Sequence, residues 1–141
     1  MGTGTARLST RPDHWLLETV GRRLVKIEEV KVLHRNYLEV PAEAAAEGIT
    51  IRWIIGRPEG APNFALRVIE FQPGAVFHTH QHPFEHEIFV LEGEGVAEGP
   101  HGEVAMRPGV ALYIPPDEPH GYRNTGAGVL RFICVIPHVD D

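Results

Sequence analysis

The chain has 141 residues, of which 43% are hydrophobic and 23% are charged, and this is the composition of one ordinary globular domain. Its formal net charge is −6, and this excess of acidic residues argues against a nucleic-acid partner. No apolar run approaches the roughly 18 residues of a membrane span, and the N-terminus lacks the apolar core of a signal peptide. We therefore expect a cytoplasmic protein that binds neither nucleic acid nor membrane. One cysteine excludes an intramolecular disulfide framework, whereas nine histidines are unusual.

Residues 1–48 are expected to form an extension before the main domain. Asp13 is a suitable N-cap for a short helix that runs to about Leu24. Over residues 25–40, apolar and polar residues partly alternate, which suggests edge strands. Residues 41–48 are expected to form a helical turn or a loop.

From residue 49 onward, short apolar segments are separated by turns. The 15 glycines and 12 prolines of the chain favour many short strands over long helices. We expect strands at 49–55, 64–72, 76–82, 86–91, 95–98, 103–106, 111–114, 120–124 and 129–136. Short strands at this even spacing are typical of a sandwich or barrel. The sequence therefore predicts an all-β jelly-roll barrel over residues 49–141.

The segment HTHQHPFEHE holds four of the nine histidines. Alternate side chains of a strand share a face, so His78, His80 and His82 are expected on one side. Pro83 ends this strand because it cannot donate to a sheet, and the next strand begins at His86. Imidazoles from two neighbouring strands can converge on one metal ion at about 2.0–2.1 Å. The segment therefore predicts a metal site.

Two spaced motifs resemble those of the cupin superfamily. The first consists of Gly74, five residues, His80-Gln81-His82, three residues, His86, six residues and Gly93. The second consists of Gly109, five residues, Pro115-Pro116-Asp117, two residues, His120, three residues and Asn124. The chain is similar to small single-domain cupins with a tetrahistidine manganese site. This resemblance implies a double-stranded β-helix, the jelly-roll barrel of the family, and one metal ion held by His80, His82, His86 and His120.

The sequence departs from the cupin pattern at two positions. Asp117 replaces the glycine of the second motif, which is acceptable because Asp also serves in turns and can adopt positive φ. His86 stands where the family usually has a glutamate. Glu87 is the alternative ligand if the spacing is four residues rather than three, but the count to Gly93 and the strand face favour His86.

The metal would decide the chemistry. Four neutral imidazoles leave a divalent ion its full charge, which favours anionic ligands. The resemblance favours manganese or iron, and imidazole also suits zinc, nickel and copper. Manganese or iron points to a dioxygenase-like oxidoreductase that acts on a small organic molecule. The alternative is a non-redox metal-dependent isomerase or lyase, or a module that only binds a small ligand.

Several further residues are expected near the site. His78 shares the inward parity of the ligands and is a candidate for proton transfer beside the metal. Cys134, Phe132 and Tyr122 are expected to line the pocket, with Cys134 buried as a small hydrophobic residue.

The resemblance also implies a homodimer. Phe89 and Leu91 lie on the strand face opposite His86 and need a second layer to cover them. That layer is either the N-terminal extension or another protomer.

Overall fold

A computed structural model describes residues 18–20, 23–25 and 32–139. The chain divides into two compact units, Met1–His34 and Arg35–Asp141. In the first unit, β1 (Glu18–Val20) pairs with β2 (Arg23–Val25) in an antiparallel hairpin. The structure therefore has strands where the helix from Asp13 to Leu24 was expected, in agreement with the preference of valine for strands. Asp13 itself lies outside the described residues.

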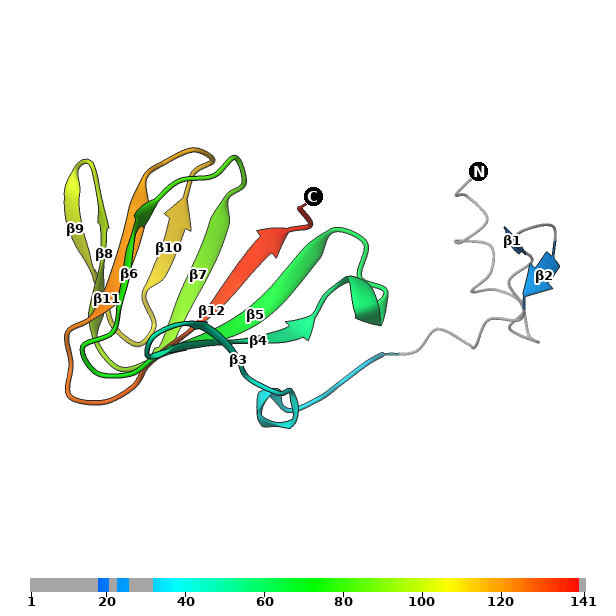
Figure 1. Ribbon diagram of the computed structural model, residues 1–141, viewed down its shortest axis with the longest axis horizontal. Coiled ribbons are helices and arrows are strands. Elements are labelled where there is room, and N and C mark those ends of the chain that lie inside the picture. The colour runs from blue at the N-terminus through cyan, green and yellow to red at the C-terminus, as the bar shows by residue number, and fades with distance from the viewer. Residues whose placement is uncertain (1–17, 21–22, 26–31, 140–141) are drawn as a thin grey trace. The chain divides into compact units, whose positions relative to one another are not determined.

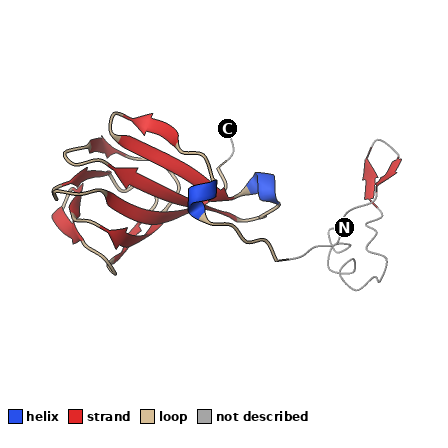
Figure 2. Cartoon of the chain, turned by 90° about the horizontal axis from the view of Figure 1, so that it is seen from below, coloured by secondary structure: helices blue, strands red, loops and turns tan. Residues whose placement is uncertain are grey.

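The second unit is built almost entirely from strands (Figures 1 and 2). Its elements are η1 (Tyr37–Glu39), β3 (Glu43–Ala46), β4 (Ile49–Ile55), η2 (Arg57–Glu59), β5 (Phe64–Phe71), β6 (Val76–His80), β7 (His86–Glu92), β8 (Gly95–Gly99), β9 (Gly102–Met106), β10 (Ala111–Ile114), β11 (His120–Asn124) and β12 (Leu130–Pro137), where η denotes a 3-10 segment. One sheet has the order β10-β7-β12-β5-β4-β3, and the other has the order β6-β11-β8-β9. The expected all-β jelly roll is confirmed. Within the described part of the chain, no helix has the length and hydropathy needed to cross a bilayer.

The edge strand β3 differs from the turn or loop expected at residues 41–48. It pairs antiparallel with β4, and its four side chains are exposed. Gly48 has a φ of 76°, a left-handed conformation that suits the tight turn between the two strands. Pairing with the sheet thus overrides the helix preference of the alanines. The sheet starts at Glu43, within a compact unit that starts at Arg35.

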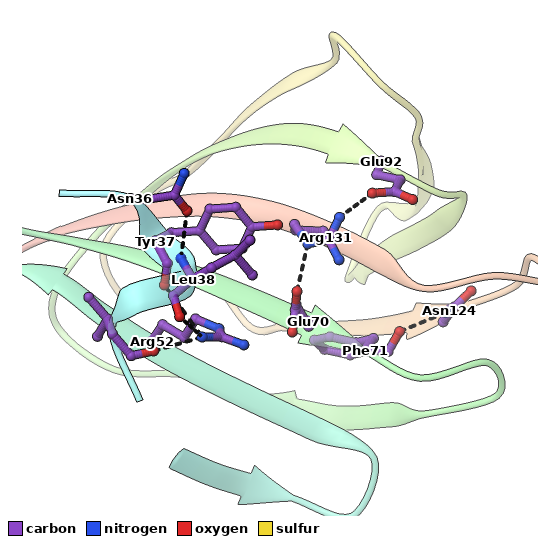
Figure 3. A network of polar contacts seen from close by, with 10 residues as sticks. Asn36, Tyr37, Leu38, Arg52, Glu70, Phe71, Glu92, Asn124 and Arg131 are labelled. Carbon is purple, nitrogen blue, oxygen red and sulfur yellow. Dashed lines mark hydrogen bonds and ion pairs between the residues drawn. The ribbon is translucent and has the colours of Figure 1, made fainter. Parts of the chain in front are cut away.

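The segment η1 lies against the outer face of the six-stranded sheet (Figure 3). This 3-10 segment falls within residues 25–40, for which edge strands had been expected. The Tyr37 ring contacts two guanidinium groups, those of Arg52 and Arg131, each 5.7 Å from its centroid. Arg52 Nη1 donates to the backbone oxygen of Val40 at 2.7 Å, and Arg131 Nε pairs with Glu70 at 2.6 Å. These contacts anchor residues 35–40 to the barrel.

The core fills the space between the two sheets. Along β12, every second side chain is buried, and these residues are Leu130, Phe132, Cys134 and Ile136. They pack on inward residues of β5 and β7 in one hydrophobic cluster. Because buried and less buried side chains alternate strictly along β12, the alternation of apolar residues in the sequence located the strand correctly.

The turn before β11 links the two histidine motifs. Asp117 has a φ of 65°, as expected for the residue that replaces the motif glycine. Its backbone N–H donates to the carbonyl oxygen of His82 at 2.7 Å. The loop after β6 is thereby tied to the turn that precedes His120.

Candidate metal centre

Three histidines meet at one end of the space between the sheets. His80 ends β6, His82 follows in the next loop, and His120 begins β11 directly opposite His80. One ring nitrogen from each lies within 4.8 Å of the others. The ring centroids of His80 and His120 are 4.3 Å apart. These three histidines are placed to hold a metal ion.

Backbone carbonyl groups orient all three rings. Each Nδ1 bonds a carbonyl oxygen two residues away in the chain, at 3.1 Å for His80 and 2.8 Å for both His82 and His120. Because a carbonyl oxygen only accepts, Nδ1 must carry the proton in each bond, and Nε2 keeps a lone pair. A metal-binding imidazole usually makes such a hydrogen bond with the ring nitrogen that does not bind the metal.

Burial favours the neutral form of two of these imidazoles, those of His82 and His120. Burial lowers the pKa of His82 and of His120 below the ordinary value. His120 Nε2 is itself buried and has no hydrogen-bond partner. An orphaned lone pair among neutral imidazoles fits a divalent cation, which needs deprotonated ligands.

His86 lies beside this group, on β7. Its Nε2 is 2.9 Å from His82 Nε2, and its ring centroid is 5.0 Å from that of His120. The side chain is only 6% exposed, and burial, followed by the nearby charge of Arg67, lowers its pKa to about 3. In the metal-free protein, His86 Nε2–H donates to His82. An ion on His86 Nε2 would require the proton on Nδ1, which lies 3.1 Å from Cys134 Sγ.

Glu87, the alternative ligand, points to the other side of β7. It is exposed, and its strand partners are Tyr113 on β10 and Val135 on β12. A hydrogen bond with the Glu85 side chain raises the pKa of Glu87 to about 7. The structure does not bring Glu87 to the histidine group.

His78 is also absent from that group, because β6 contains a bulge. His120 pairs with His80, and Tyr122 pairs with Phe77, so Gly121 alone faces two residues of β6. The extra residue reverses the alternation and puts Phe77 inward in place of His78, which is exposed and lines a different hollow.

A cavity of about 180 Å³ adjoins the histidines. Its wall consists of Ala45, Ile49, Ile51, Arg67, Ile69, Phe71, Phe77, His80, His82, Phe84, His86, Tyr122, Phe132 and Cys134. The three residues expected at the pocket are therefore in its wall. The Tyr122 hydroxyl is buried without a hydrogen-bond partner, and burial raises its pKa above the ordinary value. Tyr122 is thus a wall residue of a mostly apolar cavity, and its phenol keeps the proton.

Sequence reasoning missed Arg67. This residue is 8% exposed, and its Nη2 donates to Cys134 Sγ at 2.9 Å. The available signal was the alternation of β5, which puts an arginine in the same inward row as Ile69 and Phe71. A charge in an apolar row is the exception that points to a site.

A family model described as "Cupin domain" matches residues 67–136. The polyketide cyclase RemF from Streptomyces resistomycificus superposes with a TM-score of 0.70 at 34% sequence identity, over 76% of this chain and 80% of that one. The chain belongs to the cupin superfamily.

This cupin is 38% identical over 85 residues to the dimethylsulfoniopropionate lyase DddW of Ruegeria pomeroyi, which covers 58% of the chain and 55% of the lyase. It is 33% identical over 69 residues to an oxalate-binding protein of Thermotoga maritima, which covers 48% of the chain and 57% of that protein. The chain thus spans a little over half the length of the curated relatives it matches.

Proposed function

We propose that this cupin binds one divalent metal ion through His80, His82, His86 and His120 and transforms a small organic substrate in the adjoining cavity. The observation that supports this most strongly is the convergence of neutral imidazoles around the buried, partnerless Nε2 of His120. Manganese or iron is favoured by the resemblance, and zinc, nickel and copper also suit imidazole ligands.

A bound divalent ion supplies Lewis-acid polarisation of a substrate oxygen. The protein supplies the rest. His80, His82 and His86 lie in the cavity wall, so a substrate in the cavity would lie beside a metal ion held there, and the apolar wall excludes water from the substrate. The Tyr122 hydroxyl donates a hydrogen bond to a substrate oxygen, because burial keeps the phenol protonated.

Of the two reaction classes expected from the sequence, we favour the non-redox one, a lyase- or isomerase-type reaction. A dioxygenase-like reaction would need only the metal and coordination positions that the histidines leave free. A lyase- or isomerase-type reaction needs a proton donor as well as Lewis-acid polarisation, and the protonated phenol of Tyr122, a wall residue, is a candidate donor. The relatives named a lyase and a cyclase are consistent with this choice.

Metal content tests the proposal first. Inductively coupled plasma mass spectrometry should find about one divalent ion per chain, and His120→Ala should lose most of it, because the ligand set is broken. His101→Ala is the control, since His101 is exposed in the turn between β8 and β9. Unchanged metal content in His120→Ala would refute the site.

An oxygen electrode then separates the reaction classes. Substrate conversion without oxygen uptake supports the non-redox reaction, and oxygen uptake coupled to conversion supports the dioxygenase-like one. The relative named an oxalate-binding protein favours a third outcome, in which ligand is bound tightly and recovered unchanged. That outcome would make the chain a binding module.

A further inference from the structure

The cavity contains a buried positive charge that the metal site does not use. Arg67 lies in the cavity wall, and no carboxylate of the described residues forms an ion pair with it. Its Nε has no hydrogen-bond partner. The groups that contact its Nη2 are uncharged, namely Cys134 Sγ at 2.9 Å and His86 Nδ1 at 3.5 Å. A buried charge with neutral partners is costly, so an external anion would offset it.

The rest of the wall leaves this charge unbalanced. The wall residues named above include no aspartate and no glutamate. Glu87, next to His86 in the chain, is exposed on the other side of β7. A cavity whose wall holds a guanidinium and no acid is positive before any metal binds, and would be more so afterwards. A negatively charged ligand would balance this charge.

Neighbouring strands hold the guanidinium in place. Trp53, Arg67 and Cys134 are direct partners across β4, β5 and β12. The guanidinium carbon lies 5.3 Å from the centre of the Trp53 ring, within cation–π range, while Cys134 accepts from the other side. Such a restrained guanidinium is preorganised for a planar anion.

We propose that the cavity binds a small carboxylate and that Arg67 is the residue that recognises it. The carboxylate would lie at Arg67, and the other end of the ligand would face the metal. Only the placement of this other end rests on the proposed function. A guanidinium matches the two oxygens of a carboxylate, and the orphaned Tyr122 hydroxyl offers a further donor. The cavity of about 180 Å³ is smaller than the roughly 300–1,000 Å³ of sites for drug-sized ligands. Its isoleucine and phenylalanine walls suit a short carbon chain.

Titration calorimetry with malonate, and with malonamide as its uncharged match, tests this inference. The wild-type protein should bind malonate and bind malonamide far more weakly. Arg67→Gln should weaken malonate binding about 10- to 100-fold, the range expected for a hydrogen bond to a charged group, and should leave malonamide binding unchanged. Arg67→Lys should restore only part of the affinity, because a point charge cannot pair both oxygens.

Two further variants separate recognition from folding. Arg67→Met should lose malonate binding but melt at or above the wild-type temperature, because it removes a buried unpaired charge. Arg123→Gln, which alters a surface ion pair with Glu98, is the matched control and should bind malonate normally. A strongly destabilised Arg67→Met would show a structural role for Arg67 and overturn the inference.

The same titrations on chelator-treated protein distinguish this inference from the proposed function. Malonate binding that is weaker but still depends on Arg67 supports the inference even if the protein holds no metal. Equal binding of malonate by wild type and Arg67→Gln would overturn it, whatever the metal content. Tighter binding of inorganic phosphate than of malonate would assign the subsite to phosphate instead.

Discussion

At the scale of single residues, the imidazoles differ in how their second nitrogen is held. His80, His82 and His120 donate from Nδ1 to backbone carbonyl groups, whereas His86 Nδ1 faces the side chains of Cys134 and Arg67. Backbone acceptors cannot be changed by substitution, but the partners of His86 can. A side-chain substitution can therefore alter the hydrogen bonding of His86.

Substitutions at His86 and Glu87 decide which of these two residues binds the metal. His86→Ala should reduce metal content, because the buried imidazole adjoins His82 and His120. Glu87→Gln should leave metal content nearly unchanged, because that side chain points to the opposite face of β7. Mass spectrometry of purified, dialysed proteins measures both. Metal loss in Glu87→Gln alone would instead assign the ligand to the glutamate.

The pKa of His86 also predicts how stability depends on pH. In metal-free protein, the folded state holds this pKa near 3, whereas the unfolded chain has the ordinary value of 6.5. Between these values the unfolded chain binds more protons, so the free energy of unfolding should fall as the pH falls from about 6.5 to about 3. Above 6.5 this contribution is fully present.

Urea unfolding of chelator-treated protein at pH 7 and pH 4.5 measures this dependence. His86→Gln should lose less stability between the two pH values than the wild type. His101→Gln, altered at an exposed histidine, should behave as the wild type does. An identical pH dependence in His86→Gln would show that other groups cause the effect.

At the scale of elements, the bulge in β6 decides which side chains enter the cavity. Two residues of β6, His78 and Thr79, face Gly121 of β11, so both Phe77 and His80 point inward. Gly121 is needed for this close approach. A Cβ at this position would lie 2.8 Å from the Phe77 carbonyl oxygen and 3.0 Å from the Thr79 nitrogen.

Gly121→Ala should therefore push the bulge away from β11. We expect a loss of about 1–3 kcal/mol in the free energy of unfolding, as for other overpacked sites, together with weaker metal binding. Gly128→Ala is the control, because a Cβ there meets nothing within 4 Å. Denaturant unfolding and metal titration measure the two effects, and wild-type behaviour of Gly121→Ala would contradict this account of the bulge.

At the scale of the whole molecule, the outer face of the six-stranded sheet is covered unevenly. The η1 segment covers part of it through Tyr37, Arg52 and Arg131 (Figure 3). On β7 and β10, Phe89 remains 46% exposed and Tyr113 60% exposed. These two large apolar side chains belong to the face that the sequence expected to need a second layer.

The homodimer implied by the resemblance remains a prediction. Sedimentation velocity should show the wild-type chain as a dimer and Phe89→Glu as a monomer, because a buried carboxylate disfavours the contact. Val104→Glu, placed on the other sheet at a residue 52% exposed, should stay dimeric. A monomeric wild type would contradict the dimer.

The strand pattern typical of a barrel and the spacing of the histidines could be predicted from the sequence, because both are local. Strand alternation, glycine and proline turns, and the motif intervals around His80, His82 and His120 depend on residues close in the chain. The positive φ of Asp117 followed from the same local chemistry.

Which of the remaining residues reach the cavity depends on long-range strand pairing. The bulge opposite Gly121 removed His78, and pairing with β4 turned residues 43–46 into a strand. Arg67 acquired its surroundings from Trp53 on one side and Cys134 on the other. These outcomes depend on strand register between distant segments, and a shift of one residue reverses every side chain, so no local pattern could specify them.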